Sequence, residues 1–267
     1  MIAVARAMLG RRLRELRLDR GLTLADAARW WPATASTLSR VERGEAPLRR
    51  EAVRALVQGY ELSVDEDYDV ECLLLAAMRT AESGDRWTDD GPGRWERLFT
   101  LTQWATRATE YATFLVPARA RVPAYSQARE DTPESQLVDA VQLGTCLPVS
   151  LVIEEDVLRR PVGGPAVMVQ QLEHLLPLCT VRGDLTVRIV PQGTPTRVHA
   201  KSTFVLLEFG SGFPGFPIVW QEFGPYITYR SGRATAIARR AISGAAGAEH
   251  SATRIRGAIE DLRARHP

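Results

Sequence analysis

The amino-acid sequence predicts an all-α N-terminal domain followed by an α/β domain with a mixed sheet. Up to about residue 82, apolar side chains recur at the three- and four-residue spacing of amphipathic helices. Residues 83–93, SGDRWTDDGPG, are rich in Gly, Asp and Pro, as linkers are. Beyond them, short β-rich runs alternate with helical segments. We therefore expect domains at 1–82 and 94–267, joined by a linker at 83–93.

The first part is expected to hold five helices. Gly21 ends the first of them, since glycine is favoured just past a helix C-terminus. Thr23 is a good N-cap for a short second helix, with Asp26 in the capping-box position, and Pro32 lies beyond its end. The expected segments are 4–19, a short helix after Thr23, 35–43, about 49–59 and about 67–82.

The second part is expected to interleave helices with strands. The helices are expected at about 94–110, 134–142, 165–179, 233–243 and 248–264. The strands are expected at 112–118, 149–153, 185–191, 202–209, 217–223 and 226–230. Such interleaving is typical of layered α/β domains.

Charge is distributed unevenly along the chain, although the formal net charge is only +2. Residues 1–60 carry twelve arginines and six acidic residues, whereas residues 61–92 carry two arginines and ten acidic residues. A basic head followed by an acidic segment points to a module that binds nucleic acid.

Several classes of protein are not expected. No apolar run approaches the roughly 18 residues of a membrane span, and no signal peptide is visible, so a cytoplasmic protein is expected. The cysteines, Cys72, Cys146 and Cys179, lie far apart and indicate neither a disulfide framework nor a zinc site. No His or Cys has metal-ligand spacing to the acidic run 154–156, so neither a metal nor a cofactor is expected.

The segment from Gly21 to Gly44 has the spacing of a unit that reads DNA. One short helix would lie across the phosphate backbone, and the helix at 35–43, capped by Thr34, would enter the major groove. Its first turn must be small or polar to enter, and Arg40 follows on the same face, where it can donate to O6 and N7 of guanine. Glu42 is expected to face inward or to pair with an arginine.

This segment resembles the Xre/Cro-type helix-turn-helix family of transcriptional regulators. The matching residues are Gly21-Leu22-Thr23, Ala28 and the run Ser-Thr-Leu-Ser-Arg-Val-Glu-Arg-Gly at 36–44. The resemblance implies phosphate contacts for Thr34 and the N–H of Leu24, and a position near the DNA backbone for Arg43. It implies base contacts for Ala35, Ser36, Ser39 and Arg40. The DNA-binding residues expected are Thr23, Leu24, Thr34, Ala35, Ser36, Ser39, Arg40 and Arg43.

Two positions depart from that family. Leu24 stands where the family has Gln, which removes one side-chain contact to phosphate. Pro32 stands where the family has Gly, after the pair Trp30-Trp31, so a turn of different shape is expected.

The stretch 150–209 resembles the C-terminal domain of actinobacterial Xre regulators of the WhiJ-like, or antitoxin-like, group. The resemblance rests on Ile153-Glu154, the run 157–164, Met168, Gln171-Leu172, His174-Leu175, the run 187–191 and the run 204–209. It implies action with a small partner protein encoded nearby. The group's usual Leu-Val-Pro-Gly-Leu-Leu-Gln-Thr reads Leu-Val-Pro-Ala-Arg-Ala-Arg-Val at 115–122, so a binding role of this loop does not carry over.

A degenerate phospholipase D-like fold is an alternative form of the second domain. His199-Ala200-Lys201 is an H-x-K, in which His is a nucleophile and Lys holds phosphate. Leu206 stands where the full motif needs Asp, and a second H-x-K is missing from the sequence. We therefore do not expect an enzyme.

The leading hypothesis is a sequence-specific DNA-binding transcriptional regulator that reads double-stranded DNA as a homodimer and is regulated through its C-terminal domain. The alternative is an antitoxin-like adaptor that acts with a small partner protein. A phosphodiesterase is the third hypothesis.

Overall fold

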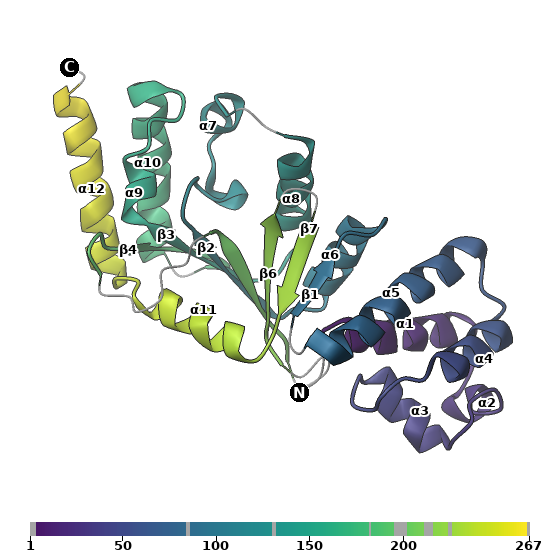
Figure 1. Ribbon diagram of the computed structural model, residues 1–267. Helices are drawn as coiled ribbons and strands as arrows, with labels where there is room; N and C mark the ends of the chain where they lie inside the picture. The colour runs from purple at the N-terminus through teal and green to yellow at the C-terminus, as the bar shows by residue number, and fades with distance from the viewer. Residues whose placement is uncertain are drawn as a thin grey trace. The chain divides into compact units, whose positions relative to one another are not determined.

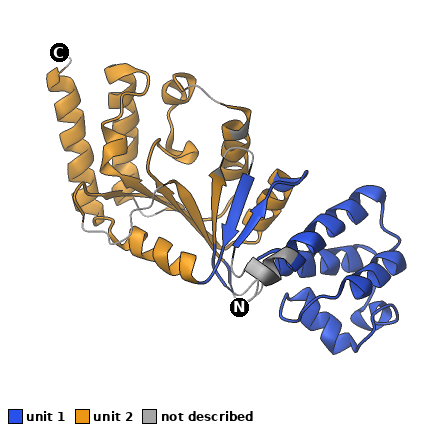
Figure 2. Cartoon of the chain, viewed as in Figure 1, with its two compact units in different colours: residues 1–94, 209–218, 226–232 blue, residues 95–208, 219–225, 233–267 orange. Residues whose placement is uncertain are grey.

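The structure is a computed structural model that describes residues 4–83, 86–129, 132–181, 183–194, 202–210, 216–223 and 226–265 (Figure 1). The chain divides into two compact units, coloured separately in Figure 2. The first unit comprises Met1–Arg94, Phe209–Ile218 and Tyr226–Gly232, and the second comprises Trp95–Glu208, Val219–Pro225 and Arg233–Pro267.

The first unit contains the five expected helices, close to their expected bounds. They are α1 (Val4–Asp19), α2 (Leu24–Ala27), α3 (Ala35–Glu42), α4 (Arg50–Tyr60) and α5 (Val64–Ser83). The leucines that predicted α1 (Leu9, Leu13 and Leu16) are fully buried. Because α1 packs against both α3 and α5, it forms the centre of this helical bundle.

The segment 83–93, expected to be a linker, contains a strand. β1 (Arg86–Asp89) pairs antiparallel with β7 (Tyr226–Arg230), which also belongs to the first unit. Trp87 stacks on Tyr229 with ring centroids 4.7 Å apart. β7 thus supplies backbone hydrogen bonds to β1, and its Tyr229 supplies an apolar contact. The Gly, Asp and Pro content of the segment predicts neither.

The second unit alternates helices and strands as expected. Its helices are α6 (Arg94–Gln103), the short 3-10 helix η1 (Ala118–Ala120), α7 (Pro123–Gln127), α8 (Pro133–Leu143), α9 (Glu155–Leu158), α10 (Gly164–Thr180), α11 (Arg233–Ser243) and α12 (Ala248–Arg265). Its strands are β2 (Arg107–Ala112), β3 (Val149–Glu154), β4 (Leu185–Val190), β5 (Phe204–Glu208) and β6 (Ile218–Phe223).

Two of these expectations were wrong. The helix expected over 94–110 ends at Gln103, and the strand expected at 112–118 lies earlier, at Arg107–Ala112. β2 is bordered by β3 and β5, which satisfy its backbone groups from both sides. This tertiary pairing outweighs the helix-compatible composition of the segment.

The strands form a mixed sheet, as predicted, in the order β1-β7-β6-β5-β2-β3-β4. β2, β3 and β4 run parallel to one another, whereas β5 runs antiparallel to β2. In this register Thr109 lies opposite Ser150, and Ser150 lies opposite Thr186. Residues opposite each other share a face of the sheet, so these three hydroxyls form a row on one face.

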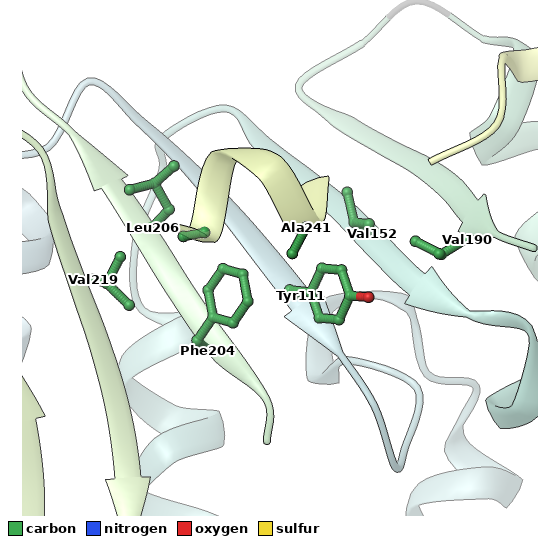
Figure 3. Packing of buried hydrophobic residues seen from close by; sticks show 8 residues of the cluster. Tyr111, Val152, Val190, Phe204, Leu206, Val219 and Ala241 are labelled. Carbon is green, nitrogen blue, oxygen red and sulfur yellow. The ribbon is translucent and has the colours of Figure 1, made fainter. Parts of the chain in front are cut away.

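The apolar part of that same face is covered by α11. Tyr111 stacks on Phe204 with centroids 5.0 Å apart, and Ala238 and Ala241 of α11 pack against the cluster (Figure 3). Helices α10 and α12 pack on each other and against β4. Among the described helices, none is long and apolar enough to cross a membrane.

Candidate nucleic-acid interface

Helices α2 and α3 are each started by a threonine. The Thr23 hydroxyl accepts a hydrogen bond from the Asp26 N–H at 3.1 Å, and the Asp26 carboxylate accepts one from the Thr23 N–H at 3.1 Å. The predicted capping box is therefore confirmed. Thr34 caps α3 by accepting a hydrogen bond from the Thr37 N–H at 3.2 Å. These caps fix where each helix begins and satisfy donors that the helices leave unpaired.

Residues 28–34 connect the two helices, which is longer than the three or four residues usual in this motif. Trp31 is buried, and Trp30 packs edge-on against Tyr60 of α4 with centroids 6.2 Å apart. A Cβ added at Gly59 would lie 2.2 Å from the Trp30 ring, so glycine is needed for this approach. The Trp30–Pro32 departure thus corresponds to a longer turn anchored on α4.

Helix α3 is held very close to α1. Leu38 and Val41 of α3 are fully buried. A Cβ added at Gly10 of α1 would lie 2.3 Å from the Val41 carbonyl oxygen. Gly44, just past α3, has a φ of +73°, and a Cβ there would lie 2.8 Å from Cα of Ala7. Side chains on either glycine would move α3 away from α1.

A buried ion pair also joins the two helices. Nε and Nη2 of Arg17 donate to the two Glu42 carboxylate oxygens at 2.6 and 2.9 Å, and Nη1 donates to the Leu22 carbonyl oxygen at 2.7 Å. The hydrogen bond to Glu42 raises the pKa of Arg17 above its ordinary value. The expectation that Glu42 faces inward or pairs with an arginine is confirmed. The spacing along the chain did not identify Arg17 as its partner.

The outer side of α3 presents the predicted face. Ser36, Arg40 and Arg43 are exposed, whereas Ala35 and Ser39 are half-buried. The structure therefore brings four of the predicted residues onto one short helix and places the fifth, Arg43, at its C-cap. Thr34 is exposed at its start, and Thr23 and Leu24 lie at the start of α2.

Arg40 is the long cationic side chain of this face. Within the described part of the chain, its guanidinium has neither a hydrogen bond nor an ion pair. Its five N–H donors are consequently available to a ligand, and the small neighbours Ser36 and Ser39 leave space around it.

Arg43, in contrast, is held by its neighbours. Its Nε and Nη2 donate to the two Glu45 carboxylate oxygens at 2.9 Å each, and its Nη1 donates to the Ser39 hydroxyl at 2.6 Å. The hydrogen bond from Arg43 lowers the pKa of Glu45. One N–H therefore remains on each terminal nitrogen of Arg43. Sequence reasoning missed Glu45, for which the only signal was its place two residues after Arg43.

The other motifs singled out in the sequence lie in the second unit. His199 and Lys201 lie outside the described residues, and Leu206 is buried in β5. In the altered loop, Arg119 donates to the Thr145 carbonyl oxygen at 2.5 Å, and Arg121 pairs with Asp139. Both arginines thus bind the protein's own groups. Among the described residues, no three His, Cys, Asp or Glu side chains form a group that could hold a metal ion.

Two family models match separate parts of the chain. A family model described as a helix-turn-helix domain matches residues 8–67, and one described as a domain of unknown function, DUF5753, matches residues 95–261. No curated protein and no solved structure matches the chain. Because the second match spans more than half of the sequence, the protein belongs to the DUF5753 family and carries a helix-turn-helix domain before its family domain.

Proposed function

We propose that this protein is a sequence-specific DNA-binding transcriptional regulator that reads the major groove with α3. The observation that carries the proposal is the outer face of α3, where Arg40 stands among small side chains on a helix-turn-helix domain. An arginine so placed can donate two hydrogen bonds to O6 and N7 of guanine, the commonest specific contact in the major groove.

The anchoring of α3 supports this role. Recognition requires a helix whose position does not change when it enters the groove. The ion pair between Arg17 and Glu42 and the close approach at Gly10 fix α3 against α1. Thr34 and the N–H of Leu24 are proposed to contact phosphates and position the domain, which phosphate contacts do without reading sequence.

We further propose that two copies bind together and that the second unit supplies regulation. One short reading helix offers few base contacts, and two copies on a two-fold axis would read half-sites about one helical turn apart. In this proposal the protein is an Xre-type regulator of the WhiJ-like group that acts in the cytoplasm by binding, not by catalysis. A small partner protein encoded nearby is proposed as a ligand of the second unit.

Selection of bound fragments from genomic DNA with the full-length protein tests the proposal. The selected site is then used in gel shifts at several salt concentrations, because contacts with phosphate make affinity fall steeply with salt. Arg40→Ala should cost about 1–3 kcal/mol and relax the preference at one base pair. Arg233→Ala, which removes one charge from α11, is the matched control and should leave the preference unchanged.

The proposal fails if no sequence is enriched, or if the combined Arg40→Ala and Arg43→Ala variant keeps its selective shift. Co-purification of a small protein without a selective shift would favour the antitoxin-like adaptor instead. Both results are read from the same purified protein, so they separate the two functions directly.

A further inference from the structure

The second unit has a hollow at one end of its parallel strands, lined by residues of the sheet and by residues 179–181 at the C-terminal end of α10. The hollow has a volume of about 400 Å³ and lies at the N-terminal ends of the parallel strands β2, β3 and β4. Its polar lining includes Arg107, Ser150, Asp184, Thr186 and Arg188. These residues come from three strands and the loop before β4, and they are close only because of the strand register.

Ser150 lies at the centre of this arrangement. Ser150 is opposite Thr109 on β2 and opposite Thr186 on β4. Arg107 precedes Thr109 by two residues and Arg188 follows Thr186 by two, so each arginine is one strand across and two residues along from Ser150. Such diagonal neighbours are about 7–8 Å apart, within the reach of long side chains. The two guanidinium groups can therefore approach one point above Ser150 from opposite sides.

The hydroxyl groups complete a set of donors. Thr186 Oγ1 donates to Ser150 Oγ at 3.2 Å. Ser150 accepts this bond, which leaves its own hydroxyl hydrogen for another acceptor. A ligand above Ser150 would thus find one hydroxyl donor between two guanidinium groups.

The two arginines are not neutralised by pairs with acidic side chains. Neither Arg107 nor Arg188 has a side-chain hydrogen bond or an ion pair to any residue that the structure describes. On the same face, Glu208 is opposite Arg107 in the register but pairs with Arg239 of α11 at 2.9 Å. Asp184 lines the hollow and offsets one of the two positive charges, which leaves a net positive charge among these residues.

We propose that this hollow binds a small organic phosphate monoester, with Arg107, Arg188 and the Ser150 hydroxyl holding the phosphate group. Guanidinium groups bind phosphate oxygens through paired, charge-assisted hydrogen bonds, and donors arriving from three directions suit a tetrahedral group better than a planar carboxylate. The hollow is also lined by the exposed side chains of Pro148 and Val181, which offer apolar surface to the organic part. A volume of this size suits a small molecule. The proposal does not depend on the function proposed for α3.

Calorimetric titration of the full-length protein with phenyl phosphate tests the site, with phenol and benzoate as comparison ligands. We expect saturable binding of phenyl phosphate. Phenol and benzoate should bind at least about tenfold more weakly, because each loses at least one of the charged hydrogen bonds to the phosphate group, and one such bond usually contributes about tenfold in affinity. Arg107→Gln with Arg188→Gln should abolish the binding. Asp184→Asn should strengthen it, because it removes the negative charge beside the phosphate.

Arg233→Gln with Arg240→Gln is the matched control, since it removes two exposed charges from α11 and should leave the affinity for phenyl phosphate unchanged. Equal affinity in the wild type and in the Arg107/Arg188 variant would overturn the proposal, as would the absence of saturable binding. Weaker DNA binding in that variant with unchanged phenyl phosphate binding would also overturn it, because the arginines would then serve nucleic acid. Thermal unfolding of each variant without ligand verifies that it is folded.

Discussion

Arg17 of α1 and Glu42 of α3 form a buried two-point ion pair, with donor–acceptor distances of 2.6 and 2.9 Å. The exposed fractions of their side chains are 6% and 3%, so neither charge is solvated by bulk water. The pair fixes the end of α3 to the centre of the helical bundle. The ion pair therefore contributes to the position of the proposed reading helix as well as to the stability of the first unit.

Glu42→Ala should destabilise the first unit strongly, because it leaves the Arg17 charge buried and unpaired, which typically costs about 3–5 kcal/mol. Arg17→Met combined with Glu42→Leu should be close to neutral, since no unpaired charge remains. Urea denaturation measures both. Glu15→Ala, which breaks the half-exposed pair between Arg11 and Glu15, should cost less than about 1 kcal/mol. Equal costs for Glu42→Ala and Glu15→Ala would contradict the anchoring role.

Gly10→Ala should destabilise the protein although alanine is the better helix former. The added Cβ would lie 2.3 Å from the Val41 carbonyl oxygen, so α1 and α3 must move apart, and overpacking of this kind costs about 1–3 kcal/mol. Gly257 of α12 is the matched control, because a Cβ there meets no atom within 4 Å. Gly257→Ala should stabilise by roughly 0.5–1 kcal/mol. Urea midpoints of the two variants should thus shift in opposite directions.

Local sequence signals were sufficient where the deciding interactions are local. The threonine caps and the leucine spacing of α1 placed the first three helices, and Glu42 was expected to face inward. The strand β1 was missed because its partner, β7, lies about 140 residues further along, in register from Arg86↔Arg230 to Asp89↔Ile227. Residues 107–110 of β2 fall within the predicted helix because the partners that make them a strand, β3 and β5, lie about 40 and about 100 residues further along.

The same reason explains which functional residues were found. The predicted residues on α3 lie on successive turns of one helix, so their common face follows from helical spacing. Their contacts with DNA stay a prediction. Arg107, Ser150 and Arg188 meet only through the parallel register of three strands. The pairing of Glu45 with Arg43 is not predicted by the sequence, because it depends on the direction that the chain takes after Gly44. Gly44 has a positive φ.

Arg43→Ala should weaken DNA binding to a similar degree for all sequences, in contrast to Arg40→Ala. Glu45 and Ser39 hold the Arg43 guanidinium and leave one N–H on each terminal nitrogen, a pair that fits two phosphate oxygens. The salt dependence of the affinity should fall by about one unit of slope. Gel shifts across salt concentrations, on the selected site and on its point variants, measure this. A preference lost at one base pair would instead make Arg43 a base-reading residue.

Glu110 of β2 gives the second unit a specific dependence on pH. The side chain is buried, and burial raises the pKa of its carboxyl group to about 7, against the opposing effects of the hydrogen bond with Gln142 and of Arg121. An unfolded chain would release this proton near the ordinary pKa of 4.5. Between pH 4.5 and 7 the folded state therefore binds more protons than the unfolded state, so raising the pH through this window lowers stability.

Glu110→Gln should remove this dependence, because the amide keeps the shape of the protonated carboxyl and does not titrate. Relative to the wild type, the variant should gain stability as the pH rises from 4.5 to 7 and should keep a constant difference above that window. Urea denaturation at half-unit pH steps measures the difference between the two proteins, which cancels groups that titrate alike in both. A difference that stays constant from pH 4.5 to 7 would show that Glu110 ionises in the folded protein as readily as in the unfolded chain.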